Sequence, residues 1–210
     1  MLDLVIFGCG GLGREVADIV DAINAVEPTW RLVGLADDNP SPEDIERLAR
    51  TEHSVLRRPD YELLPEGTAY VIGVGSGATR RLIADRLESL GWSAAVLVHP
   101  SVTTGADVQL GAGTVLCAGV RVTTNVRLGR HVLVNGNSTV GHDTSLGDFV
   151  TVNPLVAISG AVQAGEEATF GTHSAILQGL TVGPRSFVGA GACVVRDVPA
   201  ETIVKGVPAR

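Results

Sequence analysis

The hydrophobic positions between Val98 and Val194 recur every six residues without interruption. An α-helix repeats at about 3.6 residues and a strand at 2, so neither element alone accounts for this period. Short strands joined by tight corners do account for it, with one strand and one corner in each hexad. Only Thr104 and Ala164 depart from a large apolar series. The seventeen positions are Val98, Thr104, Leu110, Leu116, Val122, Leu128, Val134, Val140, Leu146, Val152, Ile158, Ala164, Phe170, Ile176, Val182, Val188 and Val194.

Glycine directly follows nine of these seventeen positions, as at Gly141 and Gly147. We expect Gly or Asn to take the corner dihedrals that β-branched residues cannot adopt, while each apolar residue points into a narrow core. Three strands then close a triangular coil of about eighteen residues, which gives between about five and six coils. With stacked strands about 4.8 Å apart, the prism is roughly 27 Å tall. A low-complexity linker would not keep such a register.

The first 95 residues alternate predicted strands with helices. The turn from Gly8 to Gly13 joins the first strand to a helix, and its backbone amides can approach a phosphate at the helix N-terminus. Asp37 and Asp38 end the second strand, where they can accept hydrogen bonds from hydroxyls of a nucleotide or sugar. The unit is too short for a six-stranded dinucleotide-binding domain, which favours a nucleotide-sugar site over NAD, with a purely structural turn as the alternative. Strands are predicted at 4–7, 32–36, 69–74 and 94–98, with a helix at 42–50 after the second.

Composition narrows the classes of function. A formal charge of −7 over 210 residues, without a dense basic run, argues against nucleic-acid binding. No apolar run approaches the roughly 20 residues of a membrane span, and the Met-Leu-Asp start lacks a basic signal-peptide flank. Cys9, Cys117 and Cys193 are an odd number without metal-ligand spacing, which fits a reducing compartment. We therefore expect a cytoplasmic protein that binds neither nucleic acid nor membrane.

One hexad carries a candidate catalytic pair, His142 followed by Asp143. Because stacked coils superpose residues eighteen apart, His142 is expected between Thr124 below and Gly160 above. A glycine there would leave the upper side of the imidazole open to a ligand and would offer an unhindered backbone amide. A lone corner histidine is more often a solvated surface residue, but the neighbouring carboxylate and glycine favour catalysis.

Taken together, these features resemble the nucleotide-sugar N-acetyltransferases of the left-handed β-helix superfamily, the group that includes bacillosamine-pathway and sialic-acid-type acetyltransferases. The resemblance covers essentially the whole chain. The hexads and the closing Val-Lys-Gly-Val-Pro-Ala-Arg mark the superfamily, whereas the N-terminal domain together with Gly-His-Asp marks the group. It implies an α/β Rossmann-like nucleotide-sugar-binding domain over 1–95, a left-handed parallel β-helix of hexapeptide repeats over 96–195, and a C-terminal capping tail over 196–210.

The resemblance also implies a mechanism and an assembly. The matching residues give His142 as general base on the sugar amine, Asp143 as the carboxylate that raises its basicity, and the Gly160 amide as the oxyanion donor. Acetyl-CoA is implied as co-substrate, lying between neighbouring β-helices of a homotrimer, with no metal. This chemistry is coherent, because an amine that attacks a thioester must lose a proton and an imidazole titrates near neutral pH.

Binding residues follow by position from the same resemblance. Leu12 departs from the family, which often has a polar or histidine side chain there, so contact would have to come from its backbone. Thr151 replaces a common histidine and can form a hydrogen bond but cannot titrate. The implied contacts are Gly10, Gly11, Leu12, Asp37, Asp38 and Gly73 for the nucleotide-sugar, and Thr151, Thr172 and Ala190 for acetyl-CoA.

A trimer also follows from the predicted prism, since contacts between unlike flat faces close into a ring under threefold symmetry. Its end strands would need covers, which the N-terminal domain and the tail can supply.

Two other function classes remain open. One is an acyltransferase for a different acceptor, such as a sugar hydroxyl or a small amine. The other is a β-helix without acyltransferase activity, either a scaffold or a zinc hydratase. A hydratase needs three histidines on one metal. His131, His142 and His173 are separated by 11 and 31 residues, so they do not stack on one edge, although histidines of neighbouring subunits could meet.

Overall fold

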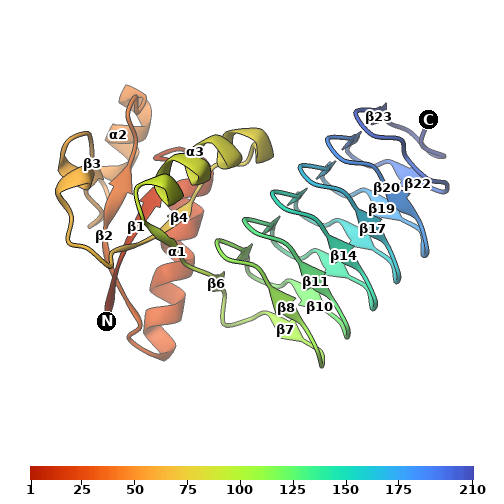
Figure 1. Ribbon diagram of the computed structural model, residues 1–210, viewed down its shortest axis with the longest axis horizontal. Helices are drawn as coiled ribbons and strands as arrows, with labels where there is room; N and C mark the ends of the chain where they lie inside the picture. Colours follow the sequence, from red (N-terminus) through yellow and green to blue (C-terminus); the bar gives the residue numbers. More distant parts are fainter. The chain divides into compact units, whose positions relative to one another are not determined.

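The computed structural model describes all 210 residues, and the chain divides into two compact units, Met1–Leu97 and Val98–Arg210 (Figure 1). The first unit has a five-stranded parallel sheet of order β3-β2-β1-β4-β5. Its strands are β1 (Leu2–Phe7), β2 (Trp30–Ala36), β3 (Val55–Leu56), β4 (Ala69–Ile72) and β5 (Ser93–Ala94). Its helices are α1 (Gly11–Val26), α2 (Pro42–Leu48), the 3-10 helix η1 (Asp60–Leu63) and α3 (Gly77–Ser89).

The sequence explains these elements locally. β1 lies in the centre of the sheet, and its run Leu4, Val5 and Ile6 is fully buried, as expected for a strand covered on both faces. Helices α2 and α3 begin at serine caps, where Ser41 and Ser76 accept hydrogen bonds from backbone amides of the first turn. No helix of the chain has the length and apolar composition that crossing a membrane requires.

The strand predicted at 94–98 is wrong as a single element. The structure has two strands there, β5 in the sheet of the first unit and β6 (Leu97–Val98) in a sheet of the repeats. Ala95 donates its amide to the Tyr70 carbonyl, whereas His99 donates to Leu116. Hydrogen bonding to two different sheets therefore divides a stretch that is apolar throughout. The short elements β3 and η1 were not predicted, and α2 ends at Leu48 rather than at residue 50.

The second unit is a parallel β-helix of two-residue strands in three sheets (Figure 1). Residues pair eighteen apart, as in Val122 with Val140 and Val140 with Ile158, except at the last turn, where Phe187 pairs with Ile203. The seven-stranded sheet contains β6, β9 (Val115–Leu116), β12 (Leu133–Val134), β15 (Thr151–Val152), β18 (Thr169–Phe170), β21 (Phe187–Val188) and β23 (Ile203–Val204). The six-stranded sheet contains β7 (Thr103–Thr104), β10 (Arg121–Val122), β13 (Thr139–Val140), β16 (Ala157–Ile158), β19 (Ala175–Ile176) and β22 (Cys193–Val194). The five-stranded sheet contains β8 (Gln109–Leu110), β11 (Arg127–Leu128), β14 (Ser145–Leu146), β17 (Gln163–Ala164) and β20 (Thr181–Val182).

The core of the β-helix is the predicted inward series. All fourteen members from Leu116 to Val194 are buried in one hydrophobic cluster, including Ala164. Val98 and Leu110 pack against this cluster and are partly buried, whereas Thr104 is exposed. Thr104, the polar member of the series, therefore lies in the first coil, before the fully buried core begins at Leu116.

The prediction that glycine takes the corner dihedrals is wrong for the glycines that follow the inward residues. The left-handed conformation falls three positions after fifteen of the seventeen inward residues, as at Asn125 (φ 55°) and Asp143 (φ 60°). No β-branched residue stands at any of these corners. The glycines act between coils instead, because a Cβ at Gly141 would lie 2.4 Å from the carbonyl carbon of Ser159 in the next coil. They allow neighbouring coils to approach each other closely.

Replacing Phe170 with Ala tests the role of the inward series in stability. Phe170 is fully buried, so Phe170→Ala should lower the free energy of unfolding by about 3–5 kcal/mol. Phe187→Ala is the matched control, since Phe187 stands on the next strand of the same sheet and is 43% exposed. Urea unfolding followed by circular dichroism should give a smaller loss for the control. Equal losses would contradict the assignment of Phe170 to the core.

Candidate active site

His142 and Asp143 form a hydrogen-bonded pair at the corner after β13. The His142 Nδ1 and Asp143 Oδ2 atoms are 2.7 Å apart, and the Asn125 side-chain amide donates to Asp143 Oδ1 at 3.1 Å. These hydrogen bonds, first from His142 and then from Asn125, lower the pKa of the Asp143 carboxyl, which keeps it ionised. An ionised carboxylate on Nδ1 favours the tautomer that protonates this nitrogen and leaves Nε2 as the basic atom. Both side chains are exposed in the single chain.

The imidazole of His142 lies directly over Gly160. A Cβ at Gly160 would be 2.5 Å from both Cε1 and Nε2 of the ring. The expectation that Gly160 leaves this space open to a ligand is therefore wrong, because the ring itself fills it. The Gly160 amide donates no hydrogen bond within the chain. The structure thus brings a basic nitrogen and a free backbone donor together on one edge.

The residues predicted to contact acetyl-CoA belong to, or directly follow, strands of a different sheet from this pair. Thr172 and Ala190 are exposed, lie eighteen residues apart at the corner after β18 and β21, and are linked by a bond from the Gly191 amide to the Thr172 carbonyl. His142 follows β13, which belongs to another sheet. Thr151 is only 2% exposed, which favours a structural role over the predicted contact. One chain therefore does not gather the predicted base and all of these residues.

The three histidines considered for a metal also remain apart. His131 is buried and stacks on Phe149 with ring centroids 5.2 Å apart, whereas His142 and His173 are exposed on other edges. No three His, Cys, Asp or Glu side chains of the chain are placed to hold a metal ion. The hydratase alternative therefore has no ligand set within one chain.

The glycine-rich turn of the first unit contains two kinds of glycine. A Cβ at Gly13 would lie 1.9 Å from the Gly8 carbonyl oxygen, and a Cβ at Gly73 would lie 2.5 Å from the Gly13 Cα. These residues let α1 approach the ends of β1 and β4, so the structure gives buried Gly73 a packing role, and its contact with substrate stays a prediction. Gly10 and Gly11 have open space where a side chain would stand. The first amides of α1 are therefore accessible to an anion.

Leu12 follows in the first turn of α1 and is half-buried. Its side chain is apolar, so the predicted polar contact there can come only from its backbone.

Asp37 braces the glycine-rich turn. Its carboxylate accepts hydrogen bonds from the backbone amides of Cys9 at 3.1 Å and Asn39 at 3.0 Å. Burial raises the pKa of the neighbouring Cys9 thiol to about 12, and that thiol donates to the Leu35 carbonyl. Cys9 is therefore a protonated structural residue, and Asp37 keeps part of its capacity to accept hydrogen bonds.

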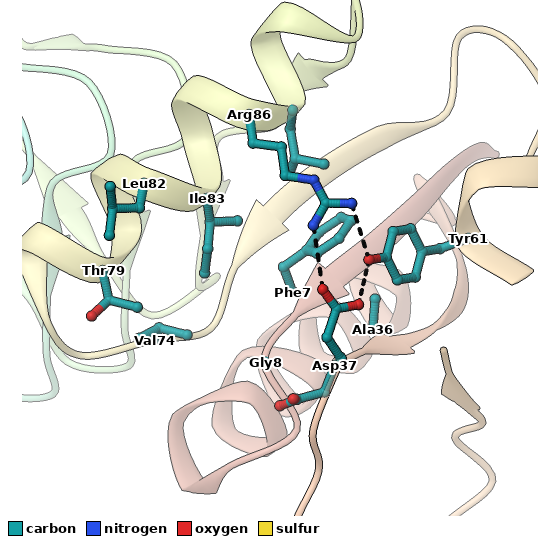
Figure 2. Close-up of a pocket in the computed structure, with 12 residues that line it drawn as sticks. Phe7, Gly8, Ala36, Asp37, Tyr61, Val74, Thr79, Leu82, Ile83 and Arg86 are labelled. Atoms are coloured by element: carbon teal, nitrogen blue, oxygen red, sulfur yellow. Dashed lines mark hydrogen bonds and ion pairs between the residues drawn. The ribbon is translucent and has the colours of Figure 1, made fainter. Parts of the chain in front are cut away.

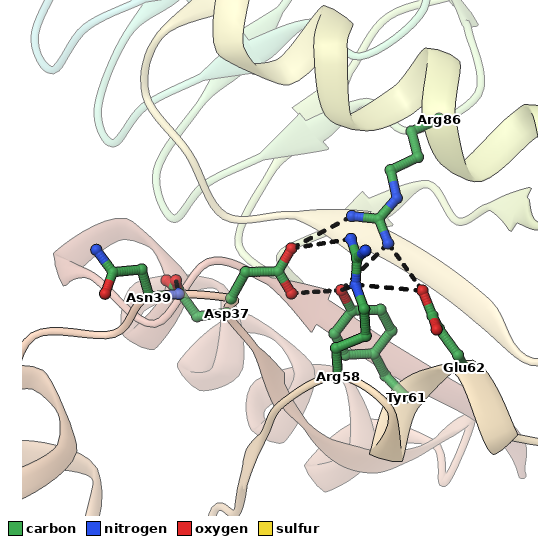
Figure 3. A network of polar contacts seen from close by, with 7 residues as sticks. Asp37, Asn39, Arg58, Tyr61, Glu62 and Arg86 are labelled. Atoms are coloured by element: carbon green, nitrogen blue, oxygen red, sulfur yellow. Dashed lines mark hydrogen bonds and ion pairs between the residues drawn. The ribbon is translucent and has the colours of Figure 1, made fainter.

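Asp38 belongs to a polar network with residues from other parts of the first unit. Figure 3 labels the other members, Arg58, Tyr61, Glu62 and Arg86. It accepts hydrogen bonds from the Tyr61 hydroxyl at 2.5 Å, from Arg58 at 3.1 Å and from Arg86 at 3.3 Å. The Tyr61 hydrogen bond, helped by Arg58 and Arg86, lowers the pKa of the Asp38 carboxyl. Glu62 completes the network by accepting from Arg86 at 2.9 Å.

A cavity of about 440 Å³ lies beside this network, at the carboxyl ends of β1, β2 and β4 (Figure 2). Phe7, Ile83 and Leu87 contribute apolar walls. The charged residues of the lining are Asp37, Asp38 and Arg86. The strand order reverses between β1 and β4, and ligands of open parallel sheets bind at such a switch point.

Sequence reasoning missed several members of these sites. Asn125 stands eighteen residues before Asp143, so the repeat itself could have placed it beneath the carboxylate. No repeat or motif in the sequence could have placed the other three, Arg58, Tyr61 and Arg86, because only the fold brings them to Asp38.

Comparison with known proteins gives matches over both units. The PglD N-terminal domain family matches residues 3–87. The structure of the acetyltransferase domain of PglB from Neisseria gonorrhoeae FA1090 is similar to 100% of this chain and 99% of that one, with 31% identity and a TM-score of 0.89. The same domain in complex with acetyl coenzyme A gives 32% identity and a TM-score of 0.88, over 99% of this chain and 98% of that one.

A further structural relative is PerB from Caulobacter crescentus in complex with CoA and GDP-perosamine. It is 26% identical, with a TM-score of 0.79 over 99% of this chain and 96% of that one. Matches to curated proteins are short. A 2,3,4,5-tetrahydropyridine-2,6-dicarboxylate N-acetyltransferase of Enterococcus faecalis is 48% identical over 44 residues, which are 21% of this chain and 19% of that protein. A relative in Staphylococcus aureus (strain COL) matches over 26% of its own length and 25% of this chain, at 36% identity.

Two neighbouring substitutions test the division of roles among the glycines of the turn. Gly13→Ala places a methyl group against the fixed Gly8 carbonyl and should lower stability by about 1–3 kcal/mol. Gly11→Ala meets only the end of the Arg14 side chain at 3.9 Å and should leave stability unchanged or raise it by up to about 1 kcal/mol, because alanine is the better helix former. Thermal unfolding of both variants checks this, and a Gly11→Ala protein as unstable as Gly13→Ala would refute it.

Proposed function

This chain belongs to the nucleotide-sugar N-acetyltransferases of the left-handed β-helix superfamily, and we propose that it transfers the acetyl group of acetyl-CoA to the amine of a nucleotide-linked amino-deoxy sugar. The observation that carries this proposal is the exposed His142–Asp143 pair, held by Asn125, with the imidazole over the backbone of Gly160. Full-length similarity to the PglB domain that binds acetyl coenzyme A, and to PerB with CoA and GDP-perosamine, supports it.

In the proposed reaction, the sugar amine attacks the thioester carbonyl carbon while His142 Nε2 accepts a proton from the amine. Asp143 stabilises the imidazolium that forms, and the Gly160 amide donates a hydrogen bond to the oxyanion of the tetrahedral intermediate. Collapse of the intermediate breaks the carbon–sulfur bond. The imidazolium then returns its proton to the leaving thiolate, which gives CoA and the amide.

Acetyl-CoA binding is proposed to need a second copy of the chain. Thr172 and Ala190 stand on a different edge from His142, so a thioester beside the base would meet these two residues only on a neighbouring β-helix. Heterologous contacts of this kind close into a ring in a homotrimer. The buried Thr151 takes no direct part in this proposal.

The first unit is proposed to hold the nucleotide. The open amides at Gly10 and Gly11 suit the pyrophosphate, because a helix N-terminus presents unpaired donors and a partial positive charge to an anion. The cavity beside β1 and β2 suits the nucleoside, because it has apolar walls and few charged groups.

The experiment that tests this function measures CoA release with a thiol reagent. The acceptors are UDP-, dTDP- and GDP-linked 4-amino-6-deoxy sugars and 3-amino sugars. Turnover with one nucleotide class is the expected result. Acetyl-CoA binding without turnover on any member would overturn the proposed acceptor and favour an O- or N-acyltransferase for a sugar hydroxyl or another small amine.

Removing the proposed base should abolish most of the activity. His142→Ala is expected to lower kcat by about 10² to 10⁴, while the melting temperature stays the same because the side chain is exposed. His99→Ala is the control, since the His99 side chain forms hydrogen bonds only with Ser101, near the start of the β-helix. An unchanged kcat in His142→Ala would remove this residue from the mechanism.

Gly160→Ala tests the placement of the imidazole without removing it. The three atoms nearest the new methyl group all belong to the His142 ring, which can rotate away, so stability should be retained. A displacement of about 1 Å should lower kcat by about 10². Gly141→Ala provides the contrast, because its methyl group would meet the backbone of the next coil and should destabilise the fold. Full activity in Gly160→Ala would contradict the geometry proposed for the base.

A further inference from the structure

The cavity of the first unit places an acceptor and a donor side by side, the Asp38 carboxylate and the Arg86 guanidinium. We propose that this pair reads the adjacent N–H and C=O groups of a nucleobase, with Arg86 as the residue that determines specificity. The site would then accept uracil, thymine and guanine nucleotides and reject cytosine and adenine nucleotides. This inference rests on the proposed function, because it takes the cavity to be the nucleoside site.

Arg86 keeps donors available to a ligand. A guanidinium carries about five N–H donors and no acceptor. In the structure Nη1 donates to Asp38 at 3.3 Å, and Nη2 donates to Tyr61 at 3.4 Å and to Glu62 at 2.9 Å. Two of the donors therefore have no acceptor in the chain. The side chain descends from α3 to the cavity and is 37% exposed, so a ligand can reach it (Figure 2).

Asp38 supplies hydrogen-bond acceptors beside the donors of Arg86. Tyr61 and Arg58 donate to this carboxylate together with Arg86, which occupies three of its roughly four acceptor positions. Asp38 remains ionised in this surrounding and can only accept hydrogen bonds. Tyr61 is buried, and its hydroxyl holds the Asp38 carboxylate in place through a hydrogen bond. The rim of the cavity therefore has a fixed polarity, an acceptor followed by a donor.

The nucleobases form two groups, which differ in whether they can form hydrogen bonds with this acceptor and donor. Uracil and thymine carry a carbonyl at position 4 and guanine carries one at position 6, each beside a ring N–H. Cytosine and adenine carry an amino group there, beside an unprotonated ring nitrogen. With the first group, the N–H faces Asp38 and the carbonyl faces Arg86. With the second group, the amine donor faces the guanidinium and the bare nitrogen faces the carboxylate, so both contacts are repulsive.

The shape of the cavity agrees with a base in this position. Phe7, Ile83 and Leu87 provide apolar surface for the faces of a planar ring. Gly8 also lines the cavity, so the cavity lies next to the turn whose Gly10 and Gly11 amides are proposed to bind the pyrophosphate.

Arg58 offers a matched control. It contacts Asp38 at 3.1 Å, Tyr61 at 3.2 Å and Glu62 at 3.3 Å, which are the same three partners as those of Arg86. Unlike Arg86, it does not line the cavity. A purely structural role in the network would therefore give the same result at both positions, whereas base recognition would separate them.

The test is calorimetric titration of the full-length protein with UDP, CDP, GDP and ADP. At least one oxo-base nucleotide should bind about 5- to 150-fold more tightly than its amino-base counterpart, UDP against CDP or GDP against ADP. Arg86→Met should reduce this ratio to below about threefold, and Arg58→Met should retain it. Arg86→Gln, whose amide both donates and accepts, should also lose the preference and serves if the methionine variant does not fold.

Three results would overturn the inference. One is equal affinity of the wild-type protein within both nucleotide pairs. Another is a preference that survives in folded Arg86→Met and Arg86→Gln. The third is an equal loss of preference in Arg58→Met, which would assign the effect to the network as a whole. Failure of all four nucleotides to bind would be a different result, because it would remove the nucleotide site of the proposed function as well.

Discussion

The stacking of coils eighteen residues apart is the constraint on which the β-helix depends. Each two-residue strand is too short to be stable alone, and it gains its hydrogen bonds from the coils on either side. The same register aligns the inward residues into one continuous core. It also builds the candidate catalytic edge, because Asn125, Asp143 and the Gly160 backbone meet only through stacking. The geometry around His142 is therefore a property of the register rather than of a flexible loop.

The first unit depends on a different constraint, the close approach of backbones at the end of β1. Gly8, Gly13 and Gly73 have almost no space between them, which holds the start of α1 against the sheet. The Asp37 carboxylate also accepts a hydrogen bond from the Cys9 amide, which holds the turn in one conformation. In this conformation the space around Gly10 and Gly11 is open. The tightly packed glycines thus fix the position of the open glycines, so one motif supplies both close packing and the surface proposed to bind the pyrophosphate.

The sequence predicted the parts of the molecule whose cause is local or periodic. The inward series and the alternation of strands and helices are confirmed, because each follows from the spacing of apolar residues. The true role of Gly141 could not be read from the chain, since it depends on the distance to Ser159 in the next coil. The network around Asp38 could not be predicted either. Arg58, Tyr61 and Arg86 come from three places in the sequence, and only the sheet order brings them to one carboxylate.

The two candidate sites differ in what completes them. The cavity beside Asp38 is formed wholly by residues of the first unit, with its charged groups already paired and oriented. The catalytic edge is exposed and lacks the residues that stand at another corner, Thr172 and Ala190. Under the proposed function, nucleotide recognition would be fixed by the fold of one chain, whereas the acetyl-transfer site would be completed by a neighbouring β-helix. The exposed His142 and Asp143 side chains take no part in the hydrophobic core. Under the proposed function, this exposure leaves the basic nitrogen available to a thioester held by a second copy.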